Sequence, residues 1–358
     1  MTRSMASSLS FFVAASAGVL IACGGTEPAP LVPSSTCAST SPTLAATAPS
    51  STASSVAAAS SASSAPIPPQ LSPAIDEAAV AAATGVEKPE KSADGVVKAS
   101  WQRKDVDVAV DGWKMPPFMG LTSWAAFSPG RAGVAEAMVM GDLVLFEDEV
   151  NPVMSKLFDG GLQVTALHNH FFYDQPHVFF MHIGGEGKVT DLGKGVKAAL
   201  DEIAAIRKKT PKPQATFGAA KLPAKNAIDG AKLDVALTTK GNAKDGMYKA
   251  VWGRSVTASC GCPAGKVMGV NTWAAFAGTD DVAVVDGDFA VSEAELQPVL
   301  KSLRATGISI VAIHHHMSGE QPRILFLHYW GRGKSIDLAN GLKKALELTA
   351  YDGKTAAT

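Results

Sequence analysis

The chain has 358 residues, of which 46% are hydrophobic, and a formal net charge of −1 at pH 7. A charge so close to zero excludes the strongly basic surface typical of nucleic-acid binding, and no nucleic-acid partner is expected. The chain is long enough for two domains of ordinary size in addition to the terminal segments.

The first residues have the pattern of an export signal. Arg3 precedes an apolar run from Leu9 to Ala22, which suits a signal sequence and is too short to span a bilayer as a stable helix. The run ends in Leu20-Ile21-Ala22-Cys23, which matches the bacterial lipobox. We therefore expect residues 1–23 to be a lipoprotein signal sequence and Cys23 to carry the lipid. An ordinary secretory signal with a chance cysteine is the alternative.

Lipidation would export the protein and anchor it to the membrane of the cell envelope without a spanning segment. Gly24 stands where an Asp would retain a lipoprotein in the inner membrane, so in a Gram-negative cell we expect the outer membrane or the cell surface. Residues 24–72 consist largely of Ser, Ala, Thr and Pro. Such a segment buries too little apolar surface to offset its chain entropy and is predicted to be a disordered tether.

The rest of the chain contains an internal duplication. Segment 94–101 reappears as 245–252, segment 119–127 as 268–276, and segment 166–170 as 312–316. The offset between equivalent residues shrinks along the chain, as small loop deletions would produce. Two copies of this length predict a tandem domain pair rather than a solenoid. The predicted domains are a first repeat at 73–212 and a second at 213–352.

Each copy is predicted to begin with strands and to continue with a helix, a β-hairpin and a final helix. Apolar residues at helical spacing indicate the two helices, and β-rich runs separated by turns indicate the hairpin. In the first copy these elements fall at 150–157, 164–170 with 178–183, and 192–203; in the second they fall at 296–303, 310–316 with 324–329, and 338–346. Pro152 and Pro298 are expected in or just before the first helical turn. The fold class is α+β: two tandem homologous domains, each an antiparallel sheet with helices packed on one face.

The histidines are the residues most suggestive of chemistry. All eight fall inside the two predicted hairpins, and six occupy duplicated positions. His168 and His170 are two apart in a strand and should project from one face, with His182 on the return strand and Asp174 in the turn. The equivalents in the second copy are His314, His316, His328 and Glu320. Imidazoles and a carboxylate that converge from a hairpin would suit zinc, iron, manganese or nickel.

Three functions remain open at this stage. In the first, the six histidines bind divalent transition metals, Asp174 and Glu320 act as fourth ligand or general base, and the protein is a metal-dependent hydrolase of the envelope. In the second, the chain is a non-catalytic module that binds a glycan or a small molecule. In the third, the histidines are satisfied inside a polar core and have a structural role only.

Other duplicated residues have simpler interpretations. Glu149 and Glu295 are expected to cap helix starts, and Gly141-Asp142 with Gly287-Asp288 resemble turns between strands. The tryptophans are expected to pack in the core rather than to form a carbohydrate platform; they are Trp101, Trp124, Trp252 and Trp273. Lipidation of Cys23 would leave an odd number of cysteines, and no role is assigned to Cys260 and Cys262.

These segments resemble the LppY/LpqO family of bacterial lipoproteins, a group described by a domain of unknown function. The resemblance covers roughly residues 75 to 350 and rests on Asp94–Lys98, Gly120–Trp124, Val164–His170, Gln175-Pro176 and Met181-His182. It implies an envelope location and a duplicated domain, and it carries no assigned reaction. This chain departs from the usual form in having Asp174 where a Glu is more typical and three consecutive histidines at 314–316.

Overall fold

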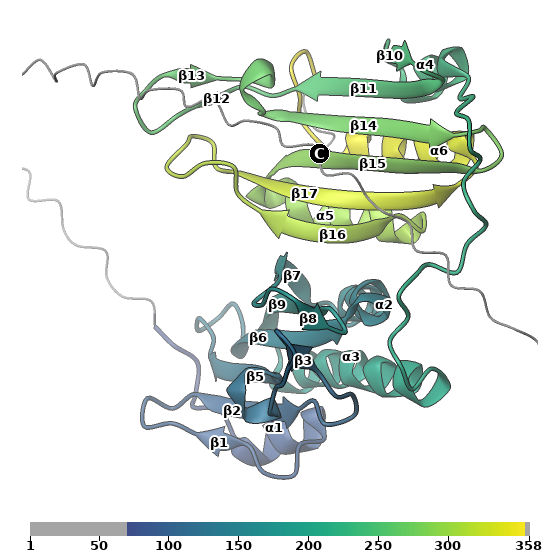
Figure 1. Ribbon diagram of the computed structural model, residues 1–358. Helices are drawn as coiled ribbons and strands as arrows, with labels where there is room; N and C mark the ends of the chain where they lie inside the picture. Colours follow the sequence, from purple (N-terminus) through teal and green to yellow (C-terminus); the bar gives the residue numbers. More distant parts are fainter. Residues whose placement is uncertain (1–69, 355–358) are drawn as a thin grey trace, which may run out of the picture. The chain divides into compact units, whose positions relative to one another are not determined.

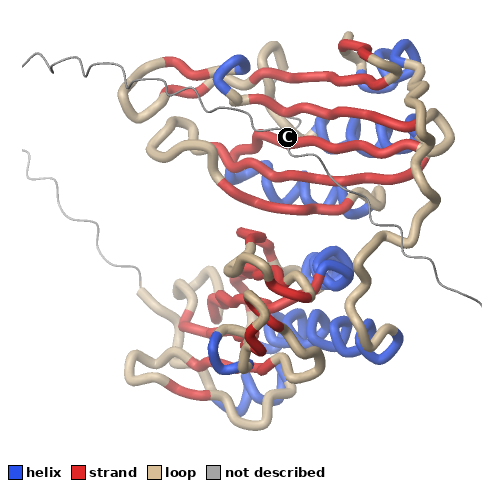
Figure 2. Tube along the Cα trace, viewed as in Figure 1, coloured by secondary structure: helices blue, strands red, loops and turns tan. Residues whose placement is uncertain are grey.

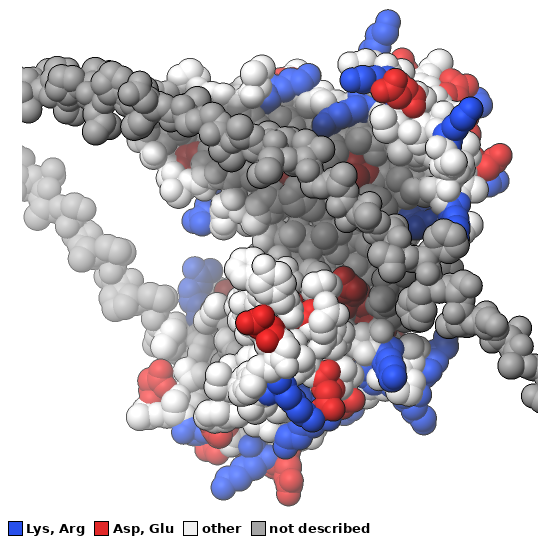
Figure 3. Space-filling view, viewed as in Figure 1, with Lys and Arg blue, Asp and Glu red and all other residues white. Residues whose placement is uncertain are grey.

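The computed structural model describes residues 70–354. The predicted signal sequence, the lipidation site at Cys23 and almost all of the predicted tether lie outside the described residues. Within residues 70–354, no helix combines the length and the apolar character needed to cross a membrane. On the face drawn in Figure 3, acidic and basic side chains are interspersed over the described surface.

The first copy begins with a short helix and continues with strands, a helix, a hairpin and a long closing helix (Figure 1). Its elements are α1 (Glu77–Thr84), β1 (Glu90–Lys91), β2 (Val97–Gln102), β3 (Ala109–Val110), β4 (Trp113–Lys114), the 3-10 helix η1 (Pro117–Met119), β5 (Thr122–Pro129), β6 (Ala137–Phe146), α2 (Glu147–Asp159), β7 (Gln163–His168), β8 (Asp174–Gln175), β9 (Val178–Gly187) and α3 (Val189–Lys209).

The second copy repeats this order of elements, except that no strand in its described residues corresponds to β8. It consists of α4 (Gly230–Leu237), β10 (Asn242–Lys244), β11 (Met247–Gly253), β12 (Val256–Thr257), β13 (Pro263–Ala264), the 3-10 helix η2 (Lys266–Met268), β14 (Asn271–Gly278), β15 (Ala283–Ser292), α5 (Glu293–Ala305), β16 (Ser309–His314), β17 (Ile324–Gly333) and α6 (Ser335–Glu347). The predicted order of strands, helix, hairpin and helix is therefore present twice.

Most of the strands, all of which are red in Figure 2, belong to one antiparallel sheet. Its order is β1-β2-β5-β6-β9-β7-β16-β17-β15-β14-β11-β10. Strands β3, β4 and β8 form a small three-stranded sheet, and β12 pairs with β13. The predicted class is confirmed at this level: a mixed α and β protein built on a large antiparallel sheet.

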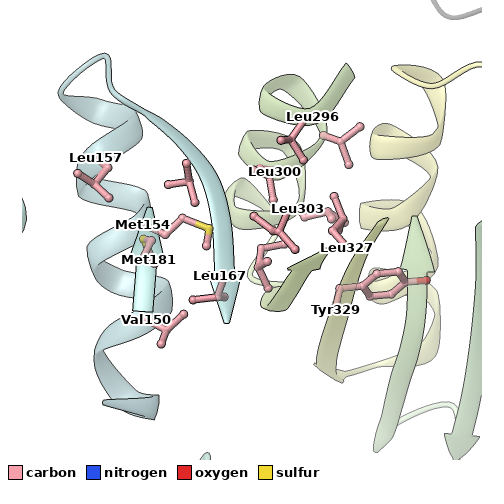
Figure 4. Packing of buried hydrophobic residues seen from close by; sticks show 14 of the residues in the cluster. Val150, Met154, Leu157, Leu167, Met181, Leu296, Leu300, Leu303, Leu327 and Tyr329 are labelled. Atoms are coloured by element: carbon pink, nitrogen blue, oxygen red, sulfur yellow. The ribbon is translucent and has the colours of Figure 1, made fainter. Parts of the chain in front are cut away.

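The main hydrophobic core lies between one face of the sheet and the helices. Figure 4 shows Met154 and Leu157 of α2 near Leu167 and Met181 of the sheet, with a similar cluster around Leu300 in the second copy. Burial of each such side chain contributes about 2 kcal/mol, which makes this the main source of stability in both copies. We call the opposite side of the sheet the outer face.

Loops cover part of the outer face in each copy. In the first copy, Val144, Phe146 and Phe180 of the sheet pack with Met115 and Leu121 from the segment around η1. The second copy has a corresponding cluster of Val256, Ala264, Val270, Ala290, Ile324 and Phe326. These two outer clusters form an apolar edge beside the histidines.

The structure corrects the expected start of the helices that contain Pro152 and Pro298. Both prolines lie inside α2 and α5, beyond the first turn. The helices begin earlier because Glu149 accepts a hydrogen bond from the backbone N–H of Phe146 at 2.9 Å, and Glu295 accepts one from Ser292 at 2.8 Å. The expected capping role of the two glutamates is therefore present, and it starts each helix directly after a strand.

The structure also corrects the turn expected at Gly141-Asp142 and Gly287-Asp288. Both pairs lie in the middle of long strands, β6 and β15. Glycine occurs there because the neighbouring strands leave no room for a side chain. A Cβ on Gly141 would lie 2.6 Å from the Trp124 carbonyl oxygen, and one on Gly287 would lie 2.1 Å from the Tyr329 hydroxyl oxygen. The reason for these glycines is tertiary packing.

Candidate metal centre

An aspartate lies directly opposite a histidine on the outer face of each copy. Asp142 of β6 pairs with His182 of β9, and Asp288 of β15 pairs with His328 of β17. Each of these strand pairs runs over ten residue pairs without a register shift. Residues directly opposite each other share a face and lie within side-chain reach, so the register brings each carboxylate next to an imidazole.

The other histidines come from the neighbouring part of the hairpin: His168 and His314 end β7 and β16, whereas His170 and His316 lie in the loop just beyond and not in the strand as expected. In the first copy the rings of His168 and His182 stack with centroids 5.1 Å apart, and Nε2 of His168 lies 3.1 Å from Nε2 of His170. The His170 ring lies flat on Phe180, with centroids 3.4 Å apart. Phe180 belongs to the outer cluster, so the apolar edge of the site supports one of its imidazoles.

The second copy repeats this geometry. His314 stacks on His328 with centroids 4.8 Å apart, and His316 lies flat on Phe326 at 3.4 Å. Nε2 of His316 lies 3.5 Å from a carboxylate oxygen of Asp288. The stacked histidine pair and the histidine on a phenylalanine thus occur in both copies, and the close histidine–aspartate contact is that of His316 with Asp288.

Several polar atoms of these residues are buried without a partner. Oδ1 of Asp142, Oδ1 of Asp288 and Nδ1 of His314 have no hydrogen-bond partner within the described part of the chain. Burying a polar atom without compensation costs about 1–3 kcal/mol. A cation bound between the aspartate and the histidines would compensate these atoms, whereas the other unpaired buried atoms of the described residues belong to Asp148, Arg207 and Glu320, outside the two clusters.

Burial also shifts the protonation of the site. It raises the pKa of Asp288 to about 7, although His328 opposes the shift. It raises the pKa of Asp142 as well, against the opposing effect of His182 and His168. Burial and then repulsion from His328 lower the pKa of His314 to about 4, and burial also lowers those of His168, His170 and His316. The lowered pKa values favour the neutral imidazole in these four histidines, and that is the form that binds metals.

The distances fit a metal ion. One ligand atom from each of Asp288, His314 and His316 lies within 4.8 Å of the other two. Two ligands of a tetrahedral ion with bonds of about 2.05 Å lie about 3.3 Å apart. The 3.1 Å between His168 and His170 and the 3.5 Å between His316 and Asp288 are close to this value. The Asp288, His314 and His316 group could therefore hold a metal ion.

The structure brings the six predicted histidines into two clusters, but it does not bring Asp174 and Glu320 to them. Asp174 accepts a hydrogen bond from the backbone N–H of Val178 at 2.6 Å, and Glu320 accepts one from Ile324 at 2.9 Å. Both carboxylates are buried in the hairpin loops, where they bind backbone groups. The carboxylates beside the histidines are instead Asp142 and Asp288.

Sequence reasoning missed these two aspartates because it assigned them to turns. A usable signal was present, since Asp142 and Asp288 occupy equivalent positions within long apolar runs. An acidic residue repeated in a strand that is otherwise buried is expected to have a partner or a function. His177 and His315 lie outside the two clusters: His177 contacts Asp174, and His315 contacts Arg323.

Comparison with known proteins supports the duplication. A family model described as Domain of Unknown Function (DUF1259) matches residues 78–202 and again residues 231–348. No curated protein matches the sequence. A crystal structure of a trimeric bacterial microcompartment shell protein, PduB, matches over 75% of this chain and 98% of that chain, with 13% identity and a TM-score of 0.18. At that TM-score the likeness carries no argument about fold or function.

Proposed function

The chain belongs to the family described as Domain of Unknown Function (DUF1259), and we propose that each of its two copies binds a divalent transition-metal ion. The proposed ligands are Asp142, His168 and His170 in the first copy and Asp288, His314 and His316 in the second. The observation that carries the proposal is a buried aspartate with an unpaired oxygen that lies opposite a histidine in both copies.

Three protein ligands leave a coordination position open, as catalytic metal sites do. Two imidazoles and one carboxylate suit zinc and also match the ligand set of non-haem iron enzymes, and manganese accepts the same donors. Zinc, iron and manganese are therefore the proposed ions, and nickel was a fourth expectation from the sequence. A closed structural site would use a fourth protein ligand, so the open position favours a reaction or a ligand exchange at the metal.

The reaction we favour is hydrolysis. A bound divalent ion would supply Lewis acidity toward a substrate or water oxygen. His182 and His328 stack on one of the ligand histidines in their own copies. A histidine in that position can accept or donate a proton within the site. Asp174 and Glu320 hold the hairpin loops and have no proposed part in the chemistry.

A cavity favours the alternative of a non-catalytic binding module. It has a volume of about 470 Å³, which falls within the usual range for small-molecule sites. Its lining is mainly apolar and includes Val150, Phe179, Phe217 and Ile310, with Asn151 and Arg304 among its polar residues. A small molecule or a glycan bound there would give this chain a function independent of metal.

We also propose that the two copies pack as a tandem pair through strands β7 and β16. The side-chain amide of Asn151 in α2 makes two hydrogen bonds to the backbone of Ile310, at 2.8 and 3.1 Å. Gln297, at the equivalent position of α5, makes two to the backbone of Val164, at 2.7 and 3.1 Å. This reciprocal pairing, together with the Leu167–Ile313 bridge, supports the arrangement.

The cellular setting is part of the proposal. A lipid on Cys23 would anchor the protein to the envelope, at the outer membrane or the surface of a Gram-negative cell, in line with the LppY/LpqO resemblance. Metabolic labelling with a fatty-acid analogue would test it, with Cys23→Ser as the control that should lose the label.

Elemental analysis of the purified full chain after dialysis tests the metal. We expect about one ion per copy and loss of metal in the His168→Ala/His314→Ala double variant. Glu320→Gln is the matched control and should keep its metal, because Glu320 binds only backbone. Metal-free protein whose thermal stability is unchanged by a chelator would refute the proposal.

A further inference from the structure

A tryptophan lies beside the aspartate of each site, one strand farther along the outer face. Trp124 of β5 pairs with Asp142, and Trp273 of β14 pairs with Asp288. Because residues directly opposite each other share a face, tryptophan, aspartate and histidine form a row across three neighbouring strands in both copies. Both indoles are half-buried, so each ring keeps a surface open to solvent.

A lysine lies over each of these tryptophans. Nζ of Lys98 is 4.8 Å from the centre of the Trp124 ring, and Nζ of Lys249 is 4.2 Å from that of Trp273. Both lysines are exposed. Neither forms a salt bridge with a carboxylate among residues 70–354. A cation–π contact orients an ammonium group without neutralising it, so both charges stay available to an anion.

The strand spacing sets the size of a ligand that reaches both the metal centre and the lysine. Neighbouring strands are about 4.8 Å apart and Lys98 on β2 lies two residues along the strands from the row of Asp142 on β6, so the two are separated by about 12 Å of sheet. A ligand that spans them crosses the Trp124 ring. Its middle should therefore be a ring that can lie on an indole, and its far end should be negatively charged. The flexible lysine stem allows the ammonium to move from the indole to that charge.

We propose that the metal centre of each copy acts on an acidic saccharide, with one sugar ring on Trp124 or Trp273 and its carboxylate on Lys98 or Lys249. The inference rests on the proposed metal function and adds the substrate class to it. Lys98 and Lys249 are then specificity-determining residues. Trp101 and Trp252 have no such part, because both pack against the core on the helix side.

The two copies should differ in affinity. Lys98 lies in line with Ala126 and Met140 across the first copy, whereas Lys249 lies in line with Ala275 and Asp286 in the second. An exposed carboxylate on the same row partly cancels the positive potential of the lysine. The first copy should therefore bind the acidic saccharide more tightly.

Calorimetric titration of the full, metal-loaded chain tests the proposal. The probes are digalacturonate and the neutral disaccharide digalactose, which keeps the rings and lacks the carboxylates. We expect tighter binding of the acidic probe, weakened about tenfold in Lys98→Met/Lys249→Met through loss of a charge-assisted hydrogen bond. The control variant is Lys194→Met, which removes another exposed lysine and should bind like the wild type.

The outcomes separate the two proposals. Equal binding of both probes, no binding of either, or full acidic-probe binding in the Lys98→Met/Lys249→Met variant would overturn the substrate class while leaving the metal site standing. Metal content, measured on every sample, should be the same in wild type and lysine variants. If the chain retains no metal after loading but still binds digalacturonate through the two lysines, the metal function is refuted and only the saccharide site remains.

Discussion

Asp142 lies directly opposite His182 across strands β6 and β9, although the two residues are far apart in the sequence. Asp288 and His328 repeat the relationship across β15 and β17. Each aspartate is nearly enclosed, with 8% of Asp142 and 2% of Asp288 exposed, and each keeps an unpaired oxygen. A buried carboxylate with no cationic side chain bonded to it must either take up a proton, as the raised pKa of Asp288 indicates, or bind a cation.

Replacement of each aspartate by asparagine should remove the charge that holds the ion. We expect Asp142→Asn and Asp288→Asn each to lose about one bound ion per chain, because the remaining ligands are neutral imidazoles. Metal content after dialysis measures the effect. Asp174→Asn is the control, since Asp174 bonds only within its own hairpin loop. Retention of both ions by the Asp142→Asn/Asp288→Asn double variant would exclude the aspartates as ligands.

Metal removal should lower the thermal stability of the protein. A ligand that binds only the folded state at about 100 times its Kd adds about 2.7 kcal/mol to the free energy of unfolding. A chelator should therefore lower the melting temperature of the wild type by several degrees. The His168→Ala/His314→Ala variant should melt at the same temperature with and without chelator. An equal chelator response in wild type and variant would place the stabilising ion elsewhere.

Addition of a methyl group at Gly287 should strongly destabilise the second copy. A Cβ there would lie 2.1 Å from the Tyr329 hydroxyl oxygen and 2.3 Å from the Trp273 carbonyl oxygen, so the two neighbouring strands would have to move apart. We expect Gly287→Ala to cost about 3 kcal/mol of unfolding free energy, measured by urea denaturation. Gly265→Ala, whose Cβ would meet nothing closer than 3.8 Å, should cost much less. Equal losses would mean that packing against Tyr329 is not what requires the glycine.

The buried pair of Glu295 and Arg254 should make the free energy of unfolding depend on pH in the acidic range. Burial by itself raises the pKa of Glu295, but hydrogen bonds from Arg254 and from backbone groups of Ser292 and Ala350 outweigh it and hold the pKa below its ordinary value. The folded state therefore binds this proton less readily than the unfolded state. The stabilisation is present above the ordinary glutamate pKa and is lost as the pH falls through the lowered one.

The Glu295→Gln variant checks this assignment. It should cost about 3 kcal/mol at neutral pH, because Arg254 is left buried without its partner. Its stability should then fall less steeply than that of the wild type below the ordinary glutamate pKa. Glu293→Gln, on the same turn but exposed, should behave like the wild type in both respects. An acid dependence that survives in Glu295→Gln would assign the effect to another carboxylate.

Asn151 tests the packing of the two copies. Asn151→Ala removes two hydrogen bonds to the backbone of Ile310 and should cost about 2 kcal/mol. If the copies support each other, the Asn151→Ala/Gln297→Ala variant should also separate the unfolding of the two copies in a calorimetric scan. Lys156→Ala, an exposed position on the same helix, is the control. A single transition as sharp as that of the wild type would argue against coupling through these side chains.

Local patterns predicted the elements well. The spacing of Val150, Val153 and Leu157 predicted helix α2, and the β-rich runs predicted the hairpins that carry the histidines. The two matches to one family model confirm the duplication. The starts of α2 and α5 are predicted less well, because the prolines suggest the first turn whereas the capping glutamates determine where each helix begins.

The face on which the histidines lie could not be predicted from spacing. Val164 and His168 are four apart and would share a face in a regular strand. An irregularity between Val164 and Ala166 changes this alternation, so Val164 enters the core while His168 lies on the outer face beside His182. The same irregularity recurs between Ile310 and Ala312. Such bulges change the face on which the following side chains lie, and the position of a bulge depends on the partner strand.

The sequence by itself determined that the chain is duplicated, that each copy combines an antiparallel sheet with helices, and that the histidines gather in two hairpins. These properties follow from periodicity and repetition, which are local. Only the tertiary structure decided which carboxylates join the histidines. Asp174 is close to His170 in sequence yet binds backbone, whereas Asp142 reaches His182 through the pairing of β6 with β9. That pairing depends on long-range strand register, which the burial of one sheet face enforces and short-range spacing does not encode.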